Sequence, residues 1–77
     1  MKITLYNENL DELHVAEVTH VTMFDEDVLF HTYFIDKQEQ QNFINACILN
    51  FIEIIVRGGN VSVTKKQTVT FKYRFDK

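Results

Sequence analysis

The segment from Asp36 to Gly58 constrains the fold most, because it is the longest run in which apolar residues recur with helical spacing. The carboxylate of Asp36 can cap a first turn, and Glu39, three residues later, resembles the second member of a capping box. Gly58 supplies the residue that commonly ends a helix in the left-handed conformation. We therefore expect one helix from Asp36 to about Arg57.

The segments on both sides of this helix alternate apolar and polar residues, which is typical of half-buried β-strands. We expect strands at residues 2–6, 13–24, 28–35, 60–64 and 68–75, with a tight acidic turn at residues 25–27. The sequence thus predicts a single α+β domain over residues 1–77. An antiparallel sheet of about five strands packs on one central helix, in the order β-β-β-α-β-β.

One stripe of the expected helix is apolar enough to form the core. Its members are Ile44, Cys47, Ile48, Phe51 and Ile55, and we expect them to pack on Val61, Val63, Phe71 and Tyr73. No cation lies one helical turn from Cys47 to activate its thiol. We therefore expect a buried, unreactive cysteine rather than a nucleophile.

The helix carries more apolar surface than one sheet face requires. Leu49, Ile52 and Val56 extend the apolar arc around a second flank. One interpretation is that the N-terminal segment, through Leu10 or Leu13, folds over this flank. The other is that the flank binds another chain, either a second copy or a target protein.

Composition points to the cytoplasm. The single cysteine cannot form an intramolecular disulfide, and the N-terminal residues MKITLYNENL lack the apolar core of a secretory signal. The longest helix-like apolar stretch is interrupted by Asn50 and Glu53 and is too short to span a bilayer. We expect a cytoplasmic protein that does not bind membranes.

Charge is distributed unevenly along the chain. Residues 1–53 hold ten acids against two lysines, a net −8, whereas residues 54–77 carry a net +5. Neighbouring elements can neutralise each other after folding, or the acids can orient a basic partner by their field. Asp25, Glu26 and Asp27 place three carboxylates at one hairpin tip, either as a partner-steering group or as a solvated turn.

Candidate chemistry is sparse. If Asp25 and Glu26 are the central residues of the turn, His20 lies opposite His31, but a longer turn separates them. A zinc site needs at least three protein ligands, and no cysteine or acid cluster accompanies this pair. Ser62, the only serine, lies on a strand without the context of a catalytic nucleophile. We expect no metal, no cofactor, no small-molecule substrate and no catalytic residues.

The C-terminal hairpin offers the alternative of nucleic-acid binding. Its cations are Lys65, Lys66, Lys72 and Arg74. The aromatic residues between them alternate toward the opposite face, where they serve the core rather than stack on bases. An acidic chain with eight cations also lacks the footprint of a phosphate binder, so we do not expect nucleic acid as the main partner.

Together these observations predict a small, acidic, non-enzymatic protein-binding module, homodimeric or bound to one larger partner. Small inhibitors and regulators of this type are encoded by phages and mobile elements, and some act on nucleic-acid-handling or bacterial defence proteins. The expected partner-binding residues are Leu49, Ile52, Val56, Asp25, Glu26 and Asp27. The alternative is a small nucleic-acid-binding regulator that uses the basic hairpin.

Overall fold

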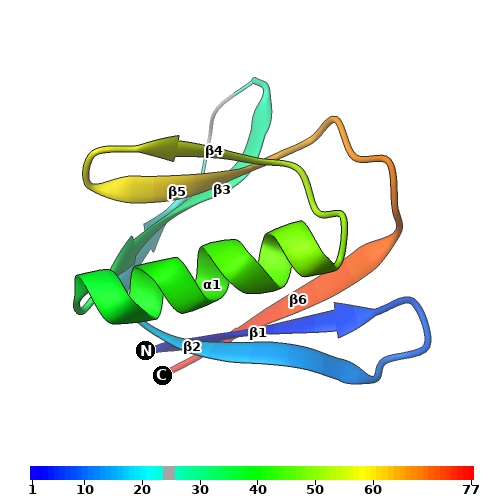
Figure 1. Ribbon diagram of the computed structural model, residues 1–77, viewed down its shortest axis with the longest axis horizontal. Coiled ribbons are helices and arrows are strands. Elements are labelled where there is room, and N and C mark those ends of the chain that lie inside the picture. The colour runs from blue at the N-terminus through cyan, green and yellow to red at the C-terminus, as the bar shows by residue number, and fades with distance from the viewer. Residues whose placement is uncertain (24–25) are drawn as a thin grey trace.

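The computed structural model describes residues 1–23 and 26–77, which form one helix and six strands (Figure 1). In chain order these are β1 (Lys2–Asn7), β2 (Glu12–Thr22), β3 (Val28–Phe34), α1 (Lys37–Leu49), β4 (Ile54–Arg57), β5 (Asn60–Thr64) and β6 (Phe71–Asp76). The strands form one antiparallel sheet in the order β4-β5-β3-β2-β1-β6. The predicted α+β class and element order are confirmed, with six strands rather than about five.

Strand β2 joins the two halves of the sheet. Its first half pairs with β1 and its second half with β3, and the register shifts between Val18 and His20. The sheet curls beyond this point. The ring of Phe30 on β3 lies 4.6 Å from that of Tyr73 on β6, although two strands separate β3 from β6 in the sheet. Helix α1 covers the same face as these rings, so this inner face holds the core.

The helix contributes two fully buried side chains to the core, Phe43 and Cys47. The Phe43 ring contacts that of Phe34 on β3, with 5.1 Å between the centroids. The predicted contributions of Val61 and Val63 are confirmed, since both are fully buried, and Phe71, Tyr73 and Ile44 pack partly buried around them. The predicted core stripe of the helix was wrong at three residues, which are exposed rather than buried: Ile48, Phe51 and Ile55.

The helix begins as the sequence predicts. Asp36 is the N-cap, and its carboxylate accepts a hydrogen bond of 2.8 Å from the backbone N–H of Glu39. The carboxylate of Glu39 accepts instead from the backbone N–H of Glu17 on β2, at 3.2 Å. This bond ties the first turn of α1 to the sheet that it covers.

The predicted helix end at about Arg57 is wrong, because α1 ends at Leu49. The N–H of Ile52 donates to the carbonyl of Cys47, and that of Phe51 donates to the carbonyl of Ile48. This pair of bonds is the Schellman arrangement that closes helix C-termini. It turns Ile52 inward against Cys47, and both side chains are buried.

The rest of the expected helix forms strand β4, which accounts for the sixth strand. Its three β-branched residues suit a strand better than a helix end. Gly58 and Gly59 form the tight turn between Arg57 and Asn60, which pair across the β4–β5 hairpin. Among the described residues, no helix is long and apolar enough to cross a membrane.

Candidate functional site

The C-terminal end of α1 and the turn that follows carry three large apolar residues that are exposed. Ile48, Leu49 and Phe51 are 64%, 77% and 72% exposed, respectively. We call these three residues the helix-end patch. Adjacent exposed aliphatic and aromatic side chains of this size are typical of a protein–protein contact.

Phe51 also has an unusual backbone. Its φ is 59°, in the left-handed region, where the Schellman arrangement places the residue after the helix cap. Glycine is the usual residue there, because a side chain with a Cβ costs about 1–2 kcal/mol in this conformation. The exposed ring gains little burial to offset that cost.

The surface that leads to the patch is uncharged. Residues 40–52 contain no Asp, Glu, Lys or Arg, although a quarter of the chain is charged. The exposed amides pair with each other along the helix: Gln38 donates to Asn42 at 2.9 Å, and Gln41 donates to Asn45 at 2.8 Å. Depletion of charge is a feature of the buried centre of protein interfaces.

The predicted second flank of the helix does not exist as one surface. Leu49 belongs to the helix-end patch, Ile52 is core, and Val56 lies half-exposed on β4. The alternative, cover by the N-terminal segment, does not extend to Leu49 or Val56, which stay exposed. Leu13 packs against the core, but Leu10 is exposed, and neither buries Leu49.

The acidic hairpin tip is described only in part. Asp25 lies outside the described residues, whereas Glu26 and Asp27 are exposed. The carbonyl of Asp27 accepts a hydrogen bond of 3.0 Å from the N–H of Lys65. This bond links the acidic tip to the start of the basic segment.

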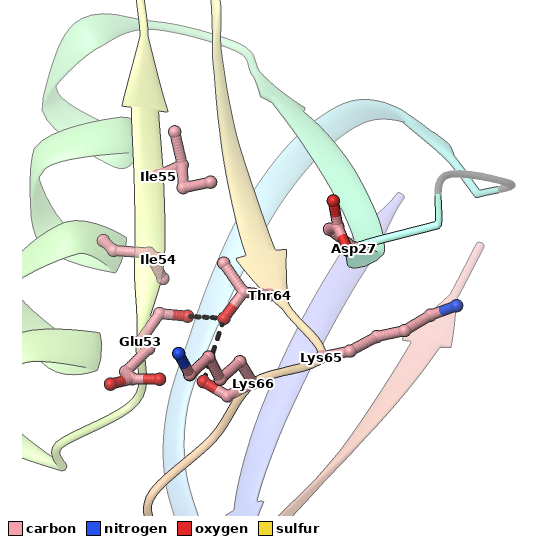
Figure 2. Close-up of a pocket in the computed structure, with 7 residues that line it drawn as sticks. All are labelled: Asp27, Glu53, Ile54, Ile55, Thr64, Lys65 and Lys66. Atoms are coloured by element: carbon pink, nitrogen blue, oxygen red, sulfur yellow. Dashed lines mark hydrogen bonds between the residues drawn. The ribbon is translucent and has the colours of Figure 1, made fainter.

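A pocket of about 500 Å³ lies beside this link. It is lined by Asp27, Glu53, Ile54, Ile55, Thr64, Lys65 and Lys66 (Figure 2). The Thr64 hydroxyl donates to the carbonyls of Glu53 and Lys66, so it bridges the two sides of the pocket. Two carboxylates and two ammonium groups line the same space, so its charge is balanced.

The other two cations of the predicted basic hairpin lie among acids. Lys72 aligns with Tyr6 of β1, and Tyr6 aligns on its other side with Glu12 of β2. Arg74 donates to the Asp76 carboxylate at 3.0 Å, and this bond raises the pKa of its guanidinium. Lys2 forms an ion pair of 3.8 Å with Glu17 on the same outer face. Opposite charges therefore alternate across these three strands.

Of the two alternatives for the histidines, the structure has the one in which they are separated. His20 aligns with Tyr33, and their rings stack at 4.0 Å with an angle of 9° between the planes. His31 aligns with Thr22 of β2 and with Ser62 of β5, and its Nδ1 lies 2.6 Å from the Ser62 hydroxyl. The two histidines share the outer face without opposing each other. In the described part of the chain, no three metal-ligating side chains converge.

The two candidate nucleophiles are buried. Cys47 is fully buried, and desolvation raises the pKa of its thiol to about 12, from an ordinary value of 9.0. Ser62 is 1% exposed. Neither side chain can meet a substrate in this conformation.

Comparison with known protein families, curated proteins and solved structures found no match.

Proposed function

We propose that this chain is a non-enzymatic protein-binding module that inhibits or regulates a larger protein. The helix-end patch is its docking group, and it enters an apolar, uncharged pocket of the target. The observation that carries this proposal is Phe51, a large ring held in solvent on a backbone conformation that favours glycine. Backbone strain of this kind is concentrated at functional positions.

The patch supports a target of complementary shape rather than a second copy. Exposed side chains that project from a helix end need a recess, and the pocket described above, between Asp27 and Lys66, is lined by four charged residues. Burial of each large side chain contributes about 1.5–3 kcal/mol, and aromatic anchors commonly dominate such contacts. The uncharged face of α1 adds no desolvation cost from ions.

The burial of the two candidate nucleophiles, Cys47 and Ser62, supports the non-enzymatic part of the proposal. Burial keeps the Cys47 thiol protonated, and Ser62 is buried on β5, between β4 and β3. The balanced charge around Lys65, Lys66, Lys72 and Arg74 gives no comparable support to nucleic-acid binding. The exposed acids Glu26 and Asp27 add negative charge at the hairpin tip, which would speed the approach of a basic target.

The test replaces Phe51 by glycine. Phe51→Gly relieves the left-handed backbone and removes the anchor, so the free protein should gain roughly 1 kcal/mol of stability while it loses its target. Stability is measured by urea unfolding. Binding is measured as the target retained from a lysate of the producing cells by each immobilised variant.

Leu10→Gly is the matched control, because Leu10 is the other exposed residue with a positive φ in residues 1–23 and 26–77, at 68°. It should gain similar stability and keep the same target. If the Phe51→Gly protein retains the same target as the wild type, the helix-end patch is not the docking group.

A further inference from the structure

Strand β4 forms one margin of the sheet, and among the described strands it pairs with β5 alone. Its residues are Ile54, Ile55, Val56 and Arg57, and the last three are exposed. A margin of this kind presents unpaired backbone groups, which proteins commonly protect with lysine or proline. The opposite margin, β6, carries Lys72 and Arg74, whereas β4 has three aliphatic residues in a row.

The backbone of β4 has a defined polarity. The carbonyl of Glu53 accepts from the N–H of Thr64 on β5, at 3.3 Å. In an antiparallel pair, residues whose groups face the partner alternate with residues whose groups face away. Glu53, Ile55 and Arg57 therefore direct their backbone groups toward β5. The groups of Ile54 and Val56 point to the free edge.

This polarity restricts how a second β4 can pair antiparallel about a two-fold axis. The register that aligns the whole strand places Ile54 opposite Val56 of the other copy and Ile55 opposite itself. Each Glu53 then lies opposite Arg57 of the other copy, twice per dimer. Both residues are exposed and have opposite charges, and directly opposed pairs of this kind stabilise a sheet.

The side chains of β4 also alternate between the two faces of the sheet. Glu53, Ile55 and Arg57 share one face of β4, and Figure 2 shows Ile54 pointing to a different side from Ile55. The two-fold contact therefore has an isoleucine pair at its centre, with an ion pair on each side. The strand is self-complementary in backbone, in apolar surface and in charge.

We propose that two copies of this chain associate through β4, antiparallel about Ile55, to form one continuous sheet. Such an isologous contact uses the same patch on both copies and closes the assembly at two. It also removes the unprotected margin of the sheet from solvent. This contact is separate from the helix-end patch.

A charge exchange tests the register. Glu53→Arg places two cations opposite each other and Arg57→Glu places two anions opposite each other, so each single variant should weaken the dimer by at least about tenfold. The double variant restores opposite charges and should recover wild-type dimerisation. The measurement is mass by light scattering over a concentration series, with far-ultraviolet circular dichroism to show that each variant is folded.

A cysteine pair tests the axis independently. In this register Ile55 meets its own copy across a non-hydrogen-bonded position, where the Cα atoms are about 4.5 Å apart and a disulfide can form. Ile55→Cys should give a covalent dimer on mild oxidation, whereas Val56→Cys should not, and the buried Cys47 should not compete.

A wild-type protein that stays monomeric at high micromolar concentration overturns the proposal. So does a double variant that fails to recover the dimer. Phe51→Gly should leave dimerisation unchanged, so failure of this contact and failure of the helix-end patch give different results.

Discussion

Phe51 and Ile52 are neighbours in the chain with opposite environments, and one backbone torsion separates them. The positive φ of Phe51 reverses the chain after α1, which sends Ile52 into the core and leaves the Phe51 ring in solvent. A glycine at this position would make the same reversal at lower cost. The aromatic side chain is therefore the part of this turn that the fold itself does not need.

Cys47 gives a second residue-scale expectation, in the pH dependence of stability. Its pKa is raised to about 12 in the native chain from 9.0 in its ordinary state. Above pH 9 the unfolded chain releases this proton and the native chain keeps it, so the native state loses stability as pH rises toward 12. Below pH 9 the contribution is complete.

Urea unfolding at several pH values from 8 upward measures this effect as the difference in unfolding free energy between the wild type and Cys47→Ala. The change of that difference with pH should correspond to about one thiol proton. Lysine and tyrosine titrations are common to both proteins and cancel. A difference that is constant with pH would mean that the thiol is solvated in the native state.

At the scale of elements, the strands and the start of the helix could be predicted, and the helix end could not. Alternation marks β1, β5 and β6, and Asp36 supplies a side-chain cap with a recognisable spacing. The residue after the helix cap is Phe51, in a position that usually carries glycine, so no residue type signals the helix end. A short apolar run such as residues 52–56 fits a helix and a strand equally well by periodicity.

The same error placed Phe51 in the predicted core. Phe51 shares a helical stripe with Cys47 only if the helix continues, and it stops at Leu49. Ile48 lies within the helix but on its exposed side. One signal in the sequence was available: the uncharged stretch at residues 40–52 exceeds what a single buried stripe requires. That stretch indicates an exposed face without ions.

The buried face of α1 is tested by a pair of alanine substitutions. Phe43→Ala removes a fully buried ring and should cost about 3–5 kcal/mol of unfolding free energy. Phe51→Ala keeps a Cβ at the strained position and removes an exposed ring, so its cost should stay within about 0.5 kcal/mol. Equal losses in urea unfolding for the two variants would contradict this assignment of the helix faces.

At the scale of the whole molecule, folding reduces the charge asymmetry of the chain. Residues 54–77 carry most of the cations, and β6 lies beside β1 and one strand from β2. Glu12, Glu17 and Asp76 therefore stand among Lys2, Lys72 and Arg74 on one face. The interpretation that neighbouring elements neutralise each other fits this arrangement.

This arrangement predicts no binding to random DNA or RNA oligonucleotides in gel-shift titrations at about 50 mM salt, where phosphate contacts are strongest. Combining Glu12→Gln with Glu17→Gln removes two of the three acids that oppose these cations and should introduce weak binding that falls steeply with salt. Binding by the wild type that is lost in Lys72→Gln would favour the nucleic-acid alternative instead.

The pairing of β1 with β6 has a consequence for biosynthesis. Lys2 aligns with Asp76, so β1 leaves the ribosome well before β6, the strand with which it pairs, and residues 1 and 77 lie together in Figure 1. Until residues 71–76 emerge, one edge of β1 stays open, and Phe30 lacks its contacts with Tyr73 and Phe75. Exposed edges and rings of this kind make nascent chains prone to aggregate. Translation speed over the last strand, and chaperones at the ribosomal exit, should therefore govern the yield of native protein.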